Sequence, residues 1–383
     1  MRIGFDLTVQ EQNPAGVARL QSSLLEGLSL VDADHEYFLY SRVRVRLPVA
    51  LGPRFKGVVA GEGVSPRRFR ARVLPPLLKE HSIDIFHSPV VAIPFRGPGV
   101  RIATAHDIPW LHPQTVKEGG ALRKTFAIGR TMRRAARVIV PSHATASDLA
   151  RIATRHEDKI VVVRPGLPRR FLAHRRDESA TIALRAELGL PDRPYLLAVG
   201  TVRYRKNLDL LFRLMAHLQA GSDAEAVPPL AIAGASLDSR KSLEIWAGEH
   251  GLERGIHFTG FVPEEKLIPL LDGALCLLFP TLLEGFGFPP LEAFARRIPV
   301  VAAPSGAVPE ILGPQSALLV PPNDLEGWLS AVRSVLTEPE LRERLVREGL
   351  KRVRDYDVEA AARSVLEVYD EVGPRPEPIE KRG

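Results

Sequence analysis

A cluster of cations follows a short apolar run near the middle of the sequence. Residues 195–199 have the composition of a buried strand, and the residues behind it that could bind an anion are Gly200, Arg203, Arg205 and Lys206. A helical pattern begins directly afterwards, and the start of a helix offers free backbone amides and a positive dipole end. Arg and Lys add charge-assisted hydrogen bonds to phosphate oxygens. The segment predicts a phosphate site, although loop cations whose stems cover apolar surface would give the same pattern.

Two glutamates follow a second strand pattern at residues 274–279. Glu284 and Glu292 flank a Gly-Phe-Gly turn, and a helix is expected to begin near Pro289, since proline is favoured in the first helical turn. Carboxylates at the carboxyl end of a strand are well placed to accept hydrogen bonds from sugar hydroxyls. Taken singly, a loop carboxylate and a first-turn glutamate also suit an ordinary helix start.

Elements of α/β type must position these segments. Short β-branched runs alternate with helical stretches along nearly the whole chain, which predicts βαβ units and parallel sheets. Six strands are expected in each half. Those of the first half are expected at residues 2–7, 36–40, 83–86, 101–105, 137–140 and 159–163. Those of the second half are expected at residues 195–199, 230–233, 256–259, 274–279, 299–302 and 317–320. Helices are expected between them, for example at 208–219 and 324–336. The pattern predicts two Rossmann-like, doubly wound domains in tandem.

The domain boundary is expected near residues 168–194, where no strand pattern occurs. We therefore expect an N-terminal Rossmann-like domain over residues 1–170 and a C-terminal one over 171–357. The final segment, 358–383, would hold a helix that either caps the second domain or crosses back to the first, followed by a frayed tail. Ligands of open α/β sheets bind beyond the carboxyl ends of the strands, so the cleft between the two sheets is the expected site.

Composition excludes several classes of protein. The 383 residues are 45% hydrophobic and 25% charged, close to the globular average, which excludes wholesale disorder. No apolar run reaches the roughly 18 residues of a transmembrane helix, and residues 1–6 lack the long apolar core of a signal peptide. Cys276 is the only cysteine, so no intramolecular disulfide or cysteine-rich zinc site is possible. A reducing cytoplasm is the expected setting.

The net charge of +7 is unevenly distributed. Residues 1–172 hold 27 Lys+Arg against 14 Asp+Glu, a balance of +13, whereas the remainder holds 25 against 31, a balance of −6. The excess is concentrated at residues 42–72, with nine basic residues against Glu62, and at 117–137, with seven against Glu118. Nucleic acid, an anionic membrane surface and a phosphorylated substrate are candidate partners, and an arginine-rich solvated surface is the alternative.

Taken together, the motifs resemble one known family. The spacing Glu284-x7-Glu292 around Gly-Phe-Gly resembles the signature of family 4 retaining glycosyltransferases, and residues 200–208 resemble that family's Arg-Lys-Asn phosphate loop. Further segments match in order, at residues 15–19, 106–107, 141–142, 163–166, 234, 260–262 and 304–310. The resemblance implies an α/β fold of the GT-B type, with two Rossmann-like doubly wound parallel-sheet domains facing across a cleft. It also implies a nucleotide-sugar donor.

The resemblance assigns roles to the cations. Lys206 and Arg205 would hold the donor diphosphate as catalytic residues. Many family members have an arginine directly after the glycine, where this chain has Thr201, so Arg203 is an alternative second cation. Breaking the anomeric bond places negative charge on the leaving diphosphate, and fixed cations stabilise that charge.

The resemblance also assigns the remaining site residues. Glu284 would contact the transferred sugar and His106 would bond one of its hydroxyls, both as catalytic residues, while Glu292 would bind the ribose. The residues expected to bind the donor are Gly16, Gly200, Arg203, Gly260, Phe261, Val262, Gly285, Phe286, Gly287, Phe288 and Glu292. The family retains anomeric configuration, and its members are thought to use front-face attack in which the leaving phosphate helps remove the acceptor proton.

No metal and no cofactor besides the donor is expected. Helix amides with Lys206 and an arginine can take the role of the divalent ion that Asp-x-Asp holds in many sugar-nucleotide enzymes. The Asp-x-Asp at residues 32–34 lies in a polar turn and is interpreted as structural, as are His87, His112 and His143, whose spacing does not suit a metal site.

Donor and acceptor are defined only by class. The motif at residues 106–109, with Gly-Thr and Arg-Lys-Asn, is most similar to mannosyl- and rhamnosyltransferases, which favours GDP-mannose over a UDP sugar. The acceptor would be a glycan or a lipid-linked glycan, as in polysaccharide biosynthesis. The basic stretches could then contact an anionic membrane peripherally, which would place the enzyme in the cytoplasm or at the inner face of the cell membrane.

Four alternatives remain. The chain could be a UDP-sugar-dependent glucosyl- or N-acetylglucosaminyltransferase of the same fold, or a GT-B sugar-nucleotide epimerase, although the ordered motifs oppose an epimerase. A non-catalytic relative that keeps the fold is a third. The fourth is a basic protein that binds nucleic acid or a membrane without catalysis. No helix-turn-helix, zinc finger or aromatic RNA-binding signature is present, so no nucleic-acid partner is expected.

Overall fold

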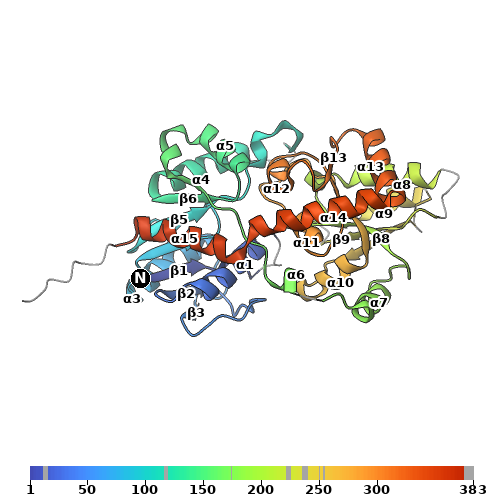
Figure 1. Cartoon of the computed structure of the whole chain (residues 1–383). Helices are drawn as coiled ribbons and strands as arrows, with labels where there is room; N and C mark the ends of the chain where they lie inside the picture. The colour runs from blue at the N-terminus through green and yellow to red at the C-terminus, as the bar shows by residue number, and fades with distance from the viewer. Residues whose placement is uncertain are drawn as a thin grey trace, which may run out of the picture. The chain divides into compact units, whose positions relative to one another are not determined.

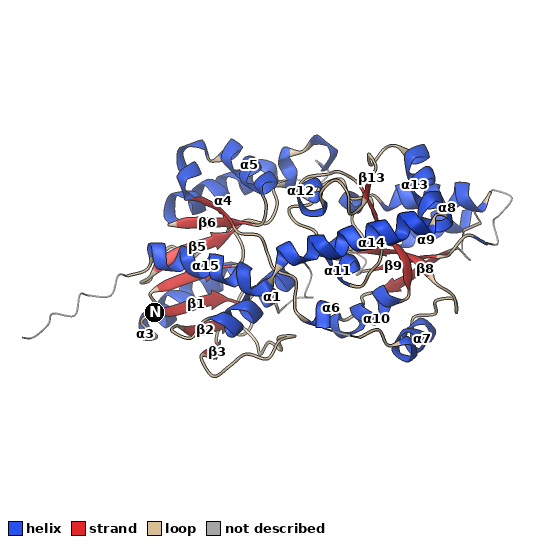
Figure 2. Cartoon of the chain, viewed as in Figure 1, coloured by secondary structure: helices blue, strands red, loops and turns tan. Residues whose placement is uncertain are grey.

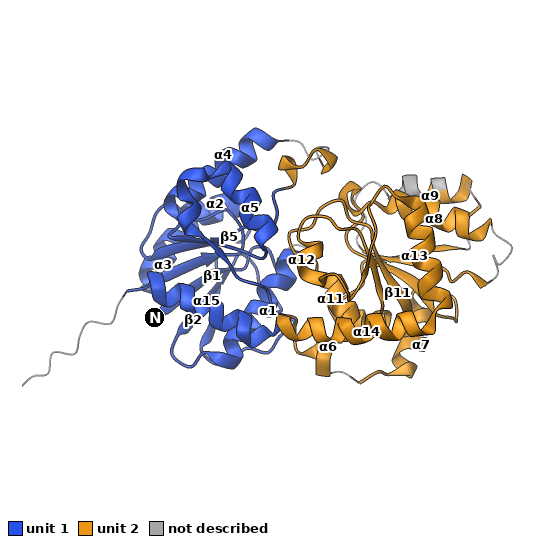
Figure 3. Cartoon of the chain, turned by 45° about the horizontal axis from the view of Figure 1, so that its top comes forward, with its two compact units in different colours: residues 1–108, 120–166, 357–383 blue, residues 109–119, 167–356 orange. Residues whose placement is uncertain are grey.

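The computed structural model describes residues 1–11, 16–115, 120–173, 175–220, 226–234, 240–249, 251–252 and 255–374. The chain forms two compact units, coloured separately in Figure 3. Unit 1 comprises residues 1–108, 120–166 and 357–383, and unit 2 comprises residues 109–119 and 167–356. Each unit contains a β-sheet and the helices that cover it, as Figure 2 shows.

The sheet of unit 1 has seven parallel strands in the order β3-β2-β1-β4-β5-β6-β7. The strands are β1 (Arg2–Asp6), β2 (Glu36–Ser41), β3 (Phe55–Val59), β4 (Ile85–Ser88), β5 (Val100–Thr104), β6 (Arg137–Val140) and β7 (Ile160–Val162). The direction of winding reverses between β1 and β4, which is the topological switch point of a doubly wound sheet.

The prediction of six strands in this half is wrong by one, because it omits β3. This strand lies at the edge of the sheet and pairs with β2. Its side chains are half-buried or exposed, and Lys56 and Gly57 occupy its middle. An edge strand meets water along one side and needs few apolar residues, so the sequence of β3 carries no strong strand pattern.

Helices cover both faces of this sheet (Figure 1). They are α1 (Gly16–Val31), α2 (Pro66–Arg68), the π-helical turn η1 (Phe69–Val73), α3 (Leu74–Glu80), α4 (Ala121–Arg134), α5 (His143–Ile152), η4 (Thr154–Lys159) and α15 (Val358–Val372). Side chains cap three of them, among them α2, where Ser65 accepts a hydrogen bond from the Arg68 amide at 3.4 Å. Ser142 accepts a hydrogen bond from the Thr145 amide at 3.1 Å at the start of α5, and Asp357 accepts one from the Ala360 amide at 2.9 Å at the start of α15.

The last helix, α15, is part of the core of unit 1. It packs along α1, and Ala362, Val365 and Tyr369 join a buried cluster with residues of β1, β2, β4 and β5. The two helices approach closely at Gly27, where a Cβ atom would overlap the carbonyl oxygen of Val358. The absence of a side chain at this one position therefore sets the distance between the two helices.

The sheet of unit 2 has the six strands that the sequence predicts, all parallel, in the order β10-β9-β8-β11-β12-β13. They are β8 (Tyr195–Val199), β9 (Leu230–Ala233), β10 (Ile256–Gly260), β11 (Ala274–Phe279), β12 (Val300–Ala302) and β13 (Leu318–Leu319). The switch point lies between β8 and β11, the two strands that precede the cations and the glutamates.

Helices also cover the sheet of unit 2. Those of eight residues or more are α7 (Glu178–Glu187), α8 (Leu208–Gln219), α9 (Arg240–Glu249), α11 (Phe288–Ala295), α13 (Leu325–Thr337) and α14 (Pro339–Val353). The shorter ones are η2 (Pro109–Leu111), η3 (Pro113–Thr115), α6 (Arg170–Ala173), η5 (Tyr204–Lys206), η7 (Glu264–Lys266), α10 (Leu267–Asp272), α12 (Val308–Leu312) and η8 (Arg354–Tyr356). The fully buried Trp328 of α13 lies in a core cluster with side chains of α8 and β11.

Gly27→Ala should destabilise unit 1, because the added methyl group would push α1 away from α15. We expect a loss of about 1–3 kcal/mol in the free energy of unfolding, the usual cost of overpacking. Gly129→Ala is the matched control, since Gly129 also lies in a helix but has open space where its Cβ would be. That change should stabilise by up to about 1 kcal/mol through helix propensity. Urea unfolding followed by circular dichroism would compare the two, and equal effects would contradict the packing argument.

Candidate functional site

The cation segment after β8 is shaped by two glycines. Gly200 has a φ of 148°, which favours glycine, and a Cβ there would lie 3.0 Å from Cε of Lys206. Gly234, after the neighbouring β9, approaches so closely that a Cβ on it would overlap the carbonyl oxygen of Gly200. The turn η5 follows, and Asn207 ends it with a left-handed φ of 53° before α8 begins. This geometry turns Lys206 back towards the end of its own strand.

Lys206 forms an ion pair with Glu284, which follows β11. The two side chains are only 15% and 11% exposed. Thr281 donates its hydroxyl to Oε1 of Glu284 at 3.1 Å, and Nη1 of Arg205 lies 4.0 Å from Oε2. The ammonium of Lys206 also lies 5.0 Å from the centre of the Phe279 ring. Two cations and a hydroxyl thus converge on one carboxylate at the switch point of the sheet.

The electrostatics of this cluster favour the ionised carboxylate. Burial alone would raise the pKa of Glu284, but the charges of Lys206 and Arg205 and the hydrogen bonds from Lys206 and Thr281 outweigh it and lower the pKa below its ordinary value. Arg205 and Lys206 together carry two positive charges against this one carboxylate. Both cations lie at the strand ends, where a ligand of such a sheet would bind.

Backbone contacts hold both segments in register. The amide of Leu282 donates to the carbonyl oxygen of Arg205 at 2.7 Å, which joins the two loops directly. The amide of Ala307 donates to the carbonyl oxygen of Glu284 at 2.8 Å. Gly306, with a φ of 59°, leaves no room for a Cβ beside that same oxygen. Residues 304–310, noted in the sequence only as a matching motif, therefore support Glu284 from behind.

The turn between the two glutamates leads into α11. Gly287 has a φ of 114°, and α11 begins at Phe288 without a side-chain cap. Phe286 packs edge-on against Phe288 and Tyr356, with ring centres 5.2 and 5.7 Å away. Glu292 lies one turn into α11 and is 1% exposed, so it is a buried carboxylate on a helix rather than a loop residue.

The other predicted donor residues of unit 2 reach the same edge of the sheet. Gly260 ends β10 with a φ of 73°, and Phe261 and Val262 follow it. Phe261 is 47% exposed, whereas Val262 is buried. Arg203 is exposed, so of the two candidate second cations it is Arg205 that lies against Glu284. Because the strands are parallel, all these segments lie beyond the carboxyl ends of the sheet.

The predicted residues of unit 1 lie at the corresponding edge of its own sheet. Gly16 is the first residue of α1, and Ala15, which belongs to the same motif, is outside the described residues. His106 follows β5, and its Nε2 is 2.6 Å from the carbonyl oxygen of Pro89. A carbonyl can only accept, so Nε2 carries the proton. Nδ1 is then an acceptor, and it is buried without a hydrogen-bond partner among the described residues.

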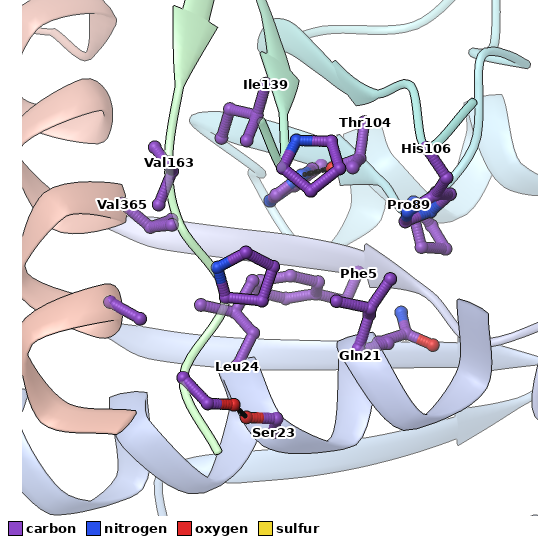
Figure 4. A pocket seen from close by; sticks show the side chains of 16 residues that line it. Phe5, Gln21, Ser23, Leu24, Pro89, Thr104, His106, Ile139, Val163 and Val365 are labelled. Atoms are coloured by element: carbon purple, nitrogen blue, oxygen red, sulfur yellow. Dashed lines mark hydrogen bonds between the residues drawn. The ribbon is translucent and has the colours of Figure 1, made fainter. Parts of the chain in front are cut away.

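His106 lines a cavity of about 60 Å³ in unit 1, shown in Figure 4. Most of its lining is apolar, and the polar exceptions are Gln21, Ser23, His87, Thr104 and His106. Burial lowers the pKa of His106, so the ring is neutral at physiological pH. His87 is hydrogen-bonded to the hydroxyls of Tyr369 and Thr104 at 2.7 and 2.8 Å. Burial, with a smaller contribution from His106, lowers the pKa of His87 to about 3.

Two contributors to these sites carry no signal in the sequence. Thr281 is one of many threonines, and only the fold places its hydroxyl on Glu284. Tyr369 lies in a helix far from β4 in the sequence, and nothing marks it as the partner of His87.

The described part of the chain contains neither a group of metal ligands nor a membrane-spanning helix. Among the described residues, no three His, Cys, Asp or Glu side chains gather as they would around a metal ion. Asp32, of the Asp-x-Asp turn, bonds His35 at 2.9 Å and also the hydroxyl of Tyr37. Within the described part of the chain, no helix has both the length and the apolar character needed to cross a bilayer.

Lys206→Met should destabilise unit 2, because Glu284 would stay buried with only the more distant Arg205 to balance it. We expect a loss of about 3 kcal/mol at neutral pH, and adding Glu284→Gln should recover most of it. All three tryptophans lie in unit 2, so tryptophan fluorescence in urea would follow this unit. Lys266→Met is the control, since its pair with Glu187 is solvent-exposed and should contribute less than about 1 kcal/mol.

The same cluster should give a defined pH dependence. The folded-state pKa of Glu284 is lowered, so its stabilising contribution is present above the unfolded-state pKa of about 4.3 and is lost as the pH falls through the folded-state value. Glu284→Gln should remove this part of the acid sensitivity. An unchanged acid profile would contradict the assigned charge state.

Comparison with known proteins gives matches along both units. The family model "Glycosyltransferase Family 4" matches residues 16–171, and the model "Glycosyl transferases group 1" matches residues 181–352. O-antigen chain mannosyltransferase B of Escherichia coli is 25% identical over 299 residues, which cover 76% of this chain and 75% of that protein. D-inositol 3-phosphate glycosyltransferase of Nocardioides sp. is 33% identical over 238 residues, which cover 58% of this chain and 51% of that protein.

Solved structures agree in fold. Sucrose-phosphate synthase from Thermosynechococcus elongatus superposes with a TM-score of 0.78 at 19% identity, covering 97% of this chain and 99% of that one. Anabaena HepE in complex with UDP-glucose gives a TM-score of 0.74 at 18% identity, covering 97% and 100%. The two family models together span most of the sequence, and the chain belongs to the family 4 glycosyltransferases, which have the GT-B fold.

Proposed function

We propose that this glycosyltransferase moves mannose, with retention of anomeric configuration, from GDP-mannose to a glycan or lipid-linked acceptor, and that it needs no metal ion. The observation that carries the proposal is the cluster of Lys206, Arg205 and Glu284 at the switch point of the unit 2 sheet. Open α/β sheets bind nucleotides at this point, beyond the carboxyl ends of the strands.

The donor diphosphate would bind to the cations of this cluster. Lys206 holds a carboxylate in the structure, and phosphate oxygens make the same kind of charge-assisted hydrogen bond. The leaving diphosphate gains negative charge as the anomeric bond breaks, and Lys206 and Arg205 are held in place to receive it. Two cations held at the diphosphate site can take the role of a divalent ion, which favours a metal-independent reaction.

The two glutamates would divide the recognition of the donor. Glu292, fixed on α11 and buried, would bind the ribose hydroxyls, while Glu284 would contact the transferred sugar. The amides of residues 285–288 and the segment 260–262 would line the rest of the donor, with Gly16 approaching the phosphates. His106 offers a neutral, buried acceptor at Nδ1, which suits a sugar hydroxyl as donor.

The choice of mannose is supported by similarity to O-antigen chain mannosyltransferase B. A UDP sugar is the second candidate, because HepE, of the same fold, was solved with UDP-glucose. We propose a cytoplasmic location, with the acceptor bound by the N-terminal domain of residues 1–170 and the donor by residues 171–357.

The test of the donor is calorimetric titration with GDP, UDP, GDP-mannose and UDP-glucose, each with and without a chelator. Micromolar binding of GDP and GDP-mannose, unchanged by the chelator, is the expected result. Preference for the uridine nucleotides would assign the donor to the UDP class, and loss of binding or turnover in excess chelator would overturn metal independence.

Substitutions should separate the proposed roles. Glu292→Ala should weaken nucleotide binding about 10- to 100-fold, the scale of a lost charge-assisted hydrogen bond, whereas Glu284→Ala should mainly lower kcat. Lys206→Ala should lower kcat/KM by about 10²–10³, as when one fixed donor to a developing anion is removed. Glu326→Ala, an exposed glutamate of α13, is the control and should change neither. Equal effects of the two site glutamates on binding would contradict the division between them.

A further inference from the structure

Helix α4 of unit 1 has an unusual outward face. The helix buries Ile128, Thr131 and Met132 against unit 1. The opposite side of the helix carries residues 122, 126, 130 and 133, because they follow one another at intervals of four, four and three. That side carries Leu122, which is 90% exposed, and Phe126, which is 65% exposed. Large apolar side chains on the outside of a helix are a cost in water unless something covers them.

A third exposed apolar side chain adjoins this face. Phe95 is 44% exposed and comes from the loop between β4 and β5. The guanidinium groups of Arg130 and Arg134 lie 4.4 and 4.6 Å from the centre of its ring. These contacts connect the aromatic ring to the basic residues of α4 and extend the surface beyond the helix.

Four arginines of this surface have no acidic partner among the described residues. Residues 120–137 hold six basic residues and no acidic one. Within the described part of the chain, Arg123, Arg130, Arg133 and Arg134 form no ion pair with Asp or Glu. In the other basic stretch, at residues 42–72, Arg42 pairs with Glu11 and Arg70 with Asp6, but the remaining arginines of the described chain there form no ion pair either. The large, exposed side chains of Leu122 and Phe126 are therefore what distinguishes α4.

A hollow of about 490 Å³ lies beside the carboxyl end of α4, lined by Phe95, Arg101, Arg133, Arg134 and Lys159 among others. The end of a helix ordinarily repels anions through its free carbonyl groups. Here Lys159 donates to the carbonyl oxygens of Met132 and Ala135, both at 3.0 Å, and covers them. The hollow therefore presents positive charge to an incoming anion.

We propose that this face docks the protein onto an anionic phospholipid surface. The α4 surface, as we name it, consists of Phe95, Leu122, Arg123, Phe126, Arg130, Arg133 and Arg134. Its arginines pair with lipid phosphates while Leu122 and Phe126 enter the boundary between headgroups and acyl chains. A soluble polyanion such as nucleic acid would use the arginines but gain nothing from the exposed leucine. The proposal is independent of the proposed donor and reaction.

The test is flotation with vesicles of phosphatidylcholine, with or without 30 mol% phosphatidylglycerol, at roughly 50 and 300 mM salt. The full chain should bind the anionic vesicles, more strongly at low salt, and should not bind the neutral ones. Replacing Arg123, Arg130 and Arg133 together by Gln should weaken binding roughly a hundredfold, at about fivefold per charge. Leu122→Ser with Phe126→Ser should weaken it about tenfold or more through lost apolar burial.

Matched controls use exposed residues of unit 2. Leu172→Ser with Ile182→Ser removes two exposed apolar side chains, although a smaller exposed area, and Arg333, Arg344 and Arg347 changed together to Gln remove the same charge. Both should bind vesicles like the unaltered protein. Failure of the unaltered protein to bind anionic vesicles at low salt would overturn the proposal. The proposal would also be overturned if the arginine variant lost binding to the vesicles while the Leu122/Phe126 variant kept it. A general polyanion site would behave in this way. Nucleotide titration of each variant shows independently whether the fold and donor site are intact.

Discussion

The ion pair between Lys206 and Glu284 is the constraint on which the carboxyl edge of unit 2 depends. The two residues are 78 positions apart, and they meet only because β8 and β11 are parallel neighbours at the switch point. Removing two charges from water is costly, and their attraction offsets that cost only when the two charged groups are fixed in a favourable geometry. The glycines and backbone bonds around the pair provide that geometry.

Backbone approach, rather than side-chain packing alone, gives this edge its shape. Gly234 lies against Gly200, and Gly306 lies against the carbonyl of Glu284, at distances that no side chain would allow. Loops fixed in this way have little freedom to rearrange when a ligand binds. The charged groups are therefore already organised for the anion that they receive, which is the condition under which fixed charges contribute most to a reaction.

The sequence predicts the buried parts of the fold well and the exposed parts poorly. β8, β9 and β11 could be placed to the residue, because strands covered on both faces are continuous apolar runs. β3 could not, since an edge strand with Lys56 and Gly57 at its centre lacks that pattern. The motif spacing brings Lys206, Arg205 and Glu284 to one region, but only the fold shows that Lys206 makes the direct contact. The sequence also could not show that Leu122 and Phe126 of α4 are exposed.

The hydrogen bond between His87 and Tyr369 joins residues 282 positions apart, and it has a consequence for the order of folding. Unit 1 begins at the first strand of the chain, yet Ala362, Val365 and Tyr369 of α15 complete its core. During synthesis the chain emerges from its N-terminus, so residues 167–356 are all available before α15 appears. Unit 2 can therefore fold first, while the sheet of unit 1, which is synthesised earlier, still lacks α15 over part of one apolar face. A released chain that stops before residue 358 would hold a finished C-terminal unit and an unfinished N-terminal one.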